Sequence, residues 1–219
     1  MPLDIFAPRE RTNNNTRTSD VVGRFRSGHQ INKRPISLKE WRVTTGDPDV
    51  AEAIRESLGG DDVSTWETKR EDNLEVFTTA TEVDVILEGI EVETVAWLPQ
   101  GKTKGFMCKG VPYESEERKP FVCTERDYAN KQEHEDAGHV CVPKVKVRFR
   151  LADNPDLGVF DFESGAWSLL SQVGYILGDM NRYETDAVLA TLGLEFVDLG
   201  PDKKFTKPVI TVTGAYEEE

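Results

Sequence analysis

The residues best suited to chemistry in this 219-residue chain are its thiols and imidazoles, which are crowded into one segment. All three cysteines and two of the three histidines lie within 34 residues: Cys108, Cys123, His134, His139 and Cys141. Three thiolates and one imidazole form a tetrahedral shell for zinc, and a closed shell of four protein ligands is structural rather than catalytic. The segment has few core-forming side chains, so metal binding would supply its folding energy.

We therefore predict a structural zinc site formed by Cys108, Cys123, His139 and Cys141, with His134 as the alternate fourth ligand. Only His139 and Cys141 are a close pair, whereas typical zinc fingers use knuckles of closely spaced ligands. The alternative is three scattered reduced cysteines and two surface histidines. A disulfide is disfavoured because the cysteine count is odd and the first residues do not resemble a secretory signal.

Several enzyme motifs are approached but not matched. His134 and His139 are five residues apart, whereas the metalloprotease helix needs a spacing of four to place both rings on one face. Residues 101–103 (GKT) look like the end of a Walker A loop, but Ala96 occupies the position of its first glycine. Residues 163–165 (ESG) lack the leading glycine of a nucleophile elbow. We therefore expect that the protein is not an enzyme; a hydrolase would need a cleft with perturbed carboxylates.

The elements that position the Cys/His segment are predicted from apolar periodicity. A helix is expected from Pro48, capped by Asp47, with apolar residues at i, i+4 and i+8 and an end at Gly59. A second helical pattern follows Ser164 as far as Met180, although glycines weaken it. Alternating apolar residues predict strands within 74–97, and at 144–151, 159–162, 194–197 and 209–212.

Two further interpretations concern shorter segments. Residues 184–192 are compatible with a helix, and an extended pair is expected at 21–26 and 30–32 with Gly28 in the turn. Most of the four tryptophans are expected in the core, and one of them is suited to anchor an interface. They are Trp41, Trp66, Trp97 and Trp167.

Together these elements predict an α+β fold, with a mixed or antiparallel sheet, a few helices and an inserted Cys/His-rich loop. We expect a flexible leader at 1–20, a single domain at 21–212 with the insertion at 105–143, and an acidic tail at 213–219. A domain of this length buries roughly 70% of its unfolded surface, so it needs no disulfides.

The net charge of −13 is unevenly distributed. Residues 1–45 contain nine Lys and Arg against four Asp and Glu, a net +5, so residues 46–219 carry −18. An acidic body repels phosphates, and we expect little or no autonomous DNA binding. The basic N-terminal part is suited to acidic partners, or is simply solvated. No apolar run approaches the roughly 20 residues of a membrane span, so no membrane contact is expected.

Four segments resemble sequences of a single phage family. They are 41–48 (WRVTTGDP), 71–78 (EDNLEVFT), 149–158 (FRLADNPDLG) and 162–169 (FESGAWSL). Together they resemble the recombination directionality factors of actinobacterial temperate phages, the partners of large serine integrases. The resemblance runs from about residue 23 to residue 170.

The resemblance implies a protein that binds the phage integrase on attachment-site DNA, in the cytoplasm of the bacterial host, and performs no chemistry itself. Protein contacts would switch recombination from attP × attB integration to attL × attR excision. Family members carry a cysteine-rich insertion before the FRLAD strand, which supports zinc. This chain has Cys123 alone where others have closely spaced cysteines, so a histidine ligand is required. The alternative is a zinc-containing phage replication or single-stranded nucleic-acid-binding protein that uses the basic segment 9–42.

Overall fold

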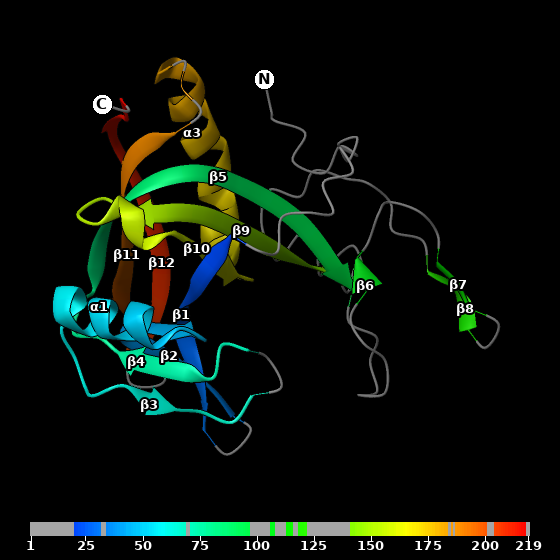
Figure 1. The fold of residues 1–219 in the computed structure, drawn as a ribbon. Coiled ribbons are helices and arrows are strands. Elements are labelled where there is room, and N and C mark those ends of the chain that lie inside the picture. The colour runs from blue at the N-terminus through cyan, green and yellow to red at the C-terminus, as the bar shows by residue number, and fades with distance from the viewer. Residues whose placement is uncertain are drawn as a thin grey trace.

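The computed structural model describes residues 20–31, 34–68, 71–96, 106–107, 113–115, 118–121, 141–183, 185, 187–200 and 204–217. Strands dominate this part of the chain, and two α-helices accompany them (Figure 1). The helices are α1 (Pro48–Leu58) and α3 (Trp167–Tyr183), and Pro155–Leu157 form a 3-10 turn. The strands are β1 (Val21–Ile31), β2 (Arg34–Thr45), β3 (Ser64–Thr65), β4 (Leu74–Phe77), β5 (Glu82–Ala96), β6 (Phe106–Met107), β7 (Tyr113–Ser115), β8 (Arg118–Phe121), β9 (Cys141–Leu151), β10 (Val159–Ser164), β11 (Val188–Asp198) and β12 (Lys204–Ala215). The fold is mixed α+β with a core made mostly of sheet, as the sequence predicts.

One sheet contains most of the strands, in the order β12–β11–β5–β9–β10–β1–β2–β4–β3, and β6 also pairs with β5. Its strands pair antiparallel except β1 and β10, which run parallel. β7 and β8 form a separate pair. The predicted strands at 144–151 and 159–162 are confirmed, and they pair with each other, since Phe149 of β9 lies opposite Phe160 of β10.

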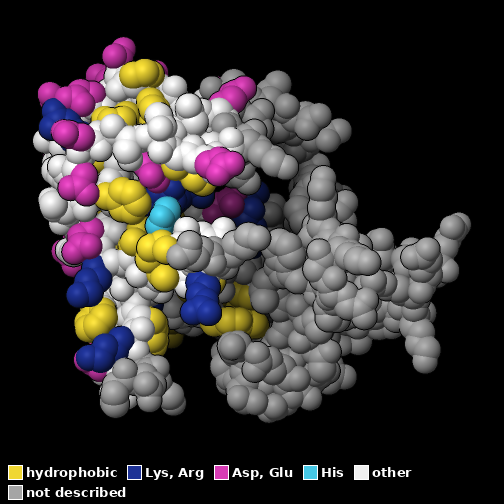
Figure 2. Space-filling view, turned by 90° about the horizontal axis from the view of Figure 1, so that it is seen from below, with side chains coloured by type: hydrophobic (Ala, Val, Ile, Leu, Met, Phe, Trp, Pro, Cys, Tyr) yellow, Lys and Arg dark blue, Asp and Glu magenta, His cyan; other side chains and the backbone are white. Residues whose placement is uncertain are grey.

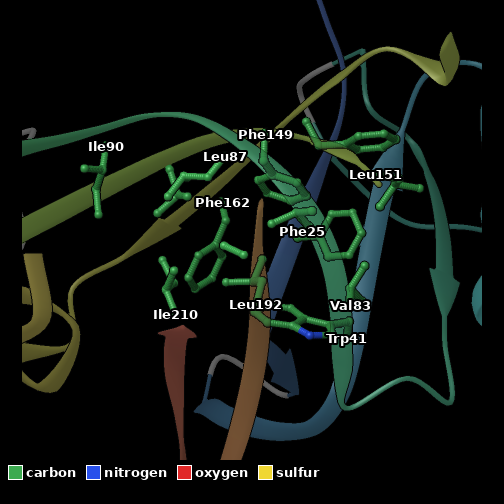
Figure 3. Close-up of a cluster of buried hydrophobic side chains, with 14 of the residues drawn as sticks. Phe25, Trp41, Val83, Leu87, Ile90, Phe149, Leu151, Phe162, Leu192 and Ile210 are labelled. Carbon is green, nitrogen blue, oxygen red and sulfur yellow. The ribbon is translucent and has the colours of Figure 1, made fainter. Parts of the chain in front are cut away.

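The sheet curls, so that β2 also packs against β11 and β12 from the far end of the strand order. An aromatic cluster fills the enclosed space (Figure 3). Phe25 meets Trp41 and Phe149 edge to face at centroid distances of 5.7 and 5.1 Å, and Trp41 meets Phe162 at 5.1 Å. Such pairs contribute about 0.5–1.5 kcal/mol beyond area burial. Trp41 is fully buried, which confirms its predicted place in the core.

Helix α1 begins and ends where the sequence predicts. The Asp47 carboxylate accepts a hydrogen bond from the Asp49 amide at 2.9 Å, Pro48 occupies the first turn, and Gly59 follows the last residue with a φ of 67°. Its buried face, which includes Ile54, packs on β2 and β4. The helix therefore closes the side of the sheet near β4.

Helix α3 buries an apolar stripe and covers a strand edge. Its buried residues include Leu170 and Val173, and it packs mainly on β12. The Gln172 side chain accepts a hydrogen bond from the Ile210 amide of β12 at 3.2 Å. Pairing the outward amide of an end strand in this way removes a docking point for foreign strands.

Two local predictions are wrong. Residues 188–192 belong to β11, because Val188, Ala190 and Leu192 alternate into the core against β5 and β12; sheet pairing there overrides local helix propensity. Gly28 does not form the turn of the first hairpin, since it lies within β1 opposite Ser37 and β1 continues to Ile31.

Candidate interaction surface

The predicted metal ligands lie almost entirely outside the described residues. Cys108, Cys123, His134 and His139 are not described, and Cys141 is placed only through its backbone, opposite Ala96 in the β5–β9 pair. Among the residues that the structure describes, no group of three or more His, Cys, Asp or Glu could hold a metal ion. The zinc site therefore remains a prediction, and residues 141–143, included in the expected insertion, form the start of β9.

Three of the alternating cations of β9 are matched by carboxylates of the neighbouring strands β10 and β5. Lys144 contacts Glu163 at 2.8 Å, and Arg150 contacts Glu88 at 2.8 Å. Arg148 lies 3.5 Å from Asp161, also on β10. Exposed pairs of this kind add little stability, but they neutralise charge. This strand therefore does not offer a row of free cations to a phosphate backbone.

A second polar cluster covers the outer face of β1, β2 and β4. One carboxylate oxygen of Asp72 accepts hydrogen bonds from Thr44 Oγ1 at 3.1 Å, Arg26 Nη2 at 2.9 Å and Arg24 Nη1 at 3.4 Å. Arg24 and Arg26 alternate with the core residue Phe25, so strand periodicity directs both guanidinium groups outward. Burial by itself raises the pKa of Asp72, but the Thr44 hydrogen bond and the two arginine charges outweigh burial and lower it.

Trp66 covers this cluster from the chain segment before β4. Its indole nitrogen donates to the Asp72 backbone carbonyl oxygen at 2.7 Å. Its ring lies against two guanidinium groups, with Arg42 at 4.6 Å and Arg26 at 5.3 Å from the centroid. The buried Arg42 in turn donates to Glu75 of β4 at 2.6 Å. Trp66 is therefore half-buried against two arginines rather than a core residue. Its contacts hold the chain segment before β4 against the sheet.

Several cations of the basic N-terminal part are paired with carboxylates of the same chain. Arg24 and Arg26 pair with Asp72, and the buried Arg42 pairs with Glu75, so carboxylates offset much of the positive charge of this part. Arg34 and Lys39 of β2 make no salt bridge within the described part of the chain. Both residues lie in the half of β2 nearer the β1–β2 turn, and Lys39 contacts the Phe196 ring of β11.

Large apolar side chains are also exposed at the ends of two hairpins, where the sequence predicted no site. We define the hairpin-end surface as the exposed apolar residues at the ends of the β1–β2 and β11–β12 hairpins: Ile31, Ile36, Phe196, Leu199 and Phe205. Figure 1 places the two hairpin ends on the same side of the molecule, and Figure 2 shows hydrophobic and basic side chains side by side on that face. In the sequence, this surface is indicated only by apolar residues on both sides of the turn at Gly200, Leu199 before it and Phe205 after it.

Comparison with known protein families shows to which family the chain belongs. A family model described as Gp3-like, recombination directionality factor-like, matches residues 22–181. The chain belongs to this family. Membership supports a recombination directionality factor of phage origin in general terms, and it implies interaction with a phage integrase. The match includes β1–β10 and most of α3, which contain the Asp72 cluster. No solved structure matches the chain significantly.

Within the described residues, neither helix has the length and apolar character that a membrane crossing requires.

Proposed function

We propose that this directionality factor binds a large serine integrase on attachment-site DNA and switches it from attP × attB integration to attL × attR excision. The family match over residues 22–181 carries the proposal. The factor acts by protein contacts and performs no chemistry itself. The cleavage and rejoining of DNA belong to the integrase.

The switch requires only a difference in affinity. A factor that bound both arrangements of the integrase complex equally would shift no equilibrium, however tightly it bound. To move the ratio of productive arrangements from 1:99 to 99:1, the factor must favour one of them by about 10⁴-fold. The factor therefore binds the arrangement in which attL and attR pair more tightly than the arrangement in which attP and attB pair.

Charge supports a role through a protein already on DNA. The chain carries −13 overall, and three cations of β9 are matched by carboxylates. Little phosphate affinity is left for autonomous DNA binding, whereas attraction to a basic, DNA-bound recombinase would speed association.

Purified integrase tests this proposal with both substrate pairs in parallel. Adding the factor at saturation should promote attL × attR recombination and inhibit attP × attB recombination. Unchanged product ratios would overturn the proposal. A gel shift with the factor alone on single- and double-stranded DNA forms the control arm, because tight, salt-sensitive binding without integrase indicates a nucleic-acid-binding protein instead.

We also propose that the cysteine-rich segment holds one structural zinc ion. The donor set Cys108, Cys123, Cys141 and one of the two nearby histidines, His139 or His134, supplies the sulfur and nitrogen ligands that zinc prefers. Elemental analysis of protein never exposed to chelator should give about one zinc per chain. A metal-free, folded preparation that still binds integrase would refute a structural role for zinc.

A further inference from the structure

The hairpin-end surface concentrates most of the exposed large apolar side chains among the described residues. The exposed fractions are 50% for Ile31, 39% for Ile36, 50% for Phe196, 66% for Leu199 and 42% for Phe205. Elsewhere in the described part, only two tyrosines of α3 are comparably exposed. Single exposed apolar residues are ordinary, but a group of them at one end of a molecule is typical of an interaction site.

The two hairpins are joined at this surface. The Lys39 ammonium group of β2 lies 5.4 Å from the ring centroid of Phe196 on β11. The strands β2 and β11 are in contact although they are not neighbours in the sheet. The curl of the sheet therefore brings the β1–β2 and β11–β12 hairpins, whose ends carry these apolar side chains, into contact.

The charge of this surface differs from that of the whole chain. On the β11–β12 hairpin, Lys204 pairs with Asp198 at 2.8 Å and Lys207 with Glu195 at 3.0 Å, so these charges cancel. On β2, neither Arg34 nor Lys39 forms a salt bridge with any residue that the structure describes. The surface is therefore apolar, and on its β2 side Arg34 and Lys39 have no carboxylate partner among the described residues, on a protein that carries −13 overall.

We propose that the hairpin-end surface is where the factor docks on the integrase, and that it receives an apolar integrase segment flanked by carboxylates. This inference rests on the proposed function for the existence of the partner. The apolar side chains supply the buried centre of the contact, and the two cations pair with the flanking carboxylates.

The chemistry favours this occupant over two others. Duplex or single-stranded DNA is held mainly by cations on phosphates. Two cations without a salt bridge, one of which lies against the Phe196 ring, do not make a phosphate-binding site beside five apolar side chains. A second copy of the chain would use the same patch twice, which would gather Arg34 and Lys39 of both copies in one contact. Like charges brought together in this way are unfavourable.

Point variants of the full chain test the inference. We expect Phe196→Ser and, separately, Leu199→Ser to weaken integrase binding at least about tenfold, because apolar anchors at the centre of an interface dominate its affinity. Lys39→Glu should weaken it as well, with a deficit that shrinks as salt is raised. Tyr175→Ser on α3 is the matched control, since it removes an aromatic ring that is 80% exposed on another element. Binding is measured by biolayer interferometry, and circular dichroism establishes that each variant is folded.

The outcomes separate this inference from the function on which it rests. Wild-type protein that neither binds integrase nor changes its products overturns the proposed function. Wild-type protein that binds and switches, with folded Phe196→Ser and Leu199→Ser variants that bind equally well, overturns only the location. Self-association of the wild type that these variants abolish would reassign the surface to a second copy, and weakened DNA binding by them would reassign it to nucleic acid.

Discussion

The Asp72→Asn substitution probes how the outer face of β1, β2 and β4 is held together. The carboxylate oxygen that accepts from Thr44, Arg26 and Arg24 would lose its charge. The other oxygen, Oδ1, is buried and has no hydrogen-bond partner among the described residues, so an amide nitrogen placed there would be an unpaired donor. Removing one partner of a fully buried ion pair costs about 3–5 kcal/mol.

The expected cost is smaller here because the arginines reach water. Their side chains are 34% exposed for Arg24 and 26% exposed for Arg26, so solvent compensates part of the lost attraction. We expect the free energy of unfolding to fall by about 2 kcal/mol at pH 7. For a chain of this length that corresponds to a fall in Tm of about 4–8 °C.

The stability that Asp72 contributes depends on pH in a defined direction. The pKa of Asp72 in the folded protein lies below its usual value of 3.8, so its contribution to stability is fully present above that value. The contribution is lost as the pH falls through the folded pKa. Urea unfolding from pH 7 down to about pH 3 should therefore show the wild-type advantage narrowing at the acid end.

The matched control is Asp153→Asn, which makes the same chemical change at an exposed carboxylate after β9. It should change the free energy of unfolding by less than about 0.5 kcal/mol. Equal stability of the Asp72 and Asp153 variants at pH 7, or an Asp72 deficit that does not change with pH, would refute the reasoning.

Three further predictions concern the backbone, the core and the charged insertion. Gly60→Ala should cost at least about 2 kcal/mol in urea unfolding, because φ is 115° and a Cβ would lie 2.0 Å from a backbone carbonyl oxygen of β4; Gly178→Ala within α3, where a Cβ meets nothing within 4 Å, should be neutral or stabilising. Phe160→Ala should cost about 3–5 kcal/mol by the same measurement, and a loss below about 1 kcal/mol would mean that the fully buried ring is not part of the core. Neutralising an acidic cluster of the insertion should weaken integrase association in a salt-dependent way, and unchanged association would refute the charge argument; the cluster is Glu114, Glu116 and Glu117.

The sequence predicts those elements that local chemistry alone specifies. Helix α1 begins at Pro48 and ends before Gly59 because its cap, its first turn and its terminating glycine all lie in the local sequence. The β9–β10 pair is likewise predictable, since apolar residues alternate on both sides of the turn near Pro155.

Features that depend on distant strands are not predictable in this way. The local sequence of residues 188–192 is compatible with a helix, but pairing with β5 and β12 makes them a strand. Gly28 is a residue typical of turns, but in the structure it lies within β1 opposite Ser37. The pairing of the basic residues is visible only in the structure, where Asp72 binds Arg24 and Arg26 from a distant part of the sequence, and where Arg34 and Lys39 form no salt bridge with a described residue. The hairpin-end surface depends on the curl of the sheet, which no local pattern encodes.

Control of recombination direction can be measured in a single reaction that contains purified integrase and all four attachment sites, with the factor titrated into it. We expect attL × attR products to rise and attP × attB products to fall as the factor is added, with both effects saturating together. A product ratio that stays constant across the titration would contradict this expectation.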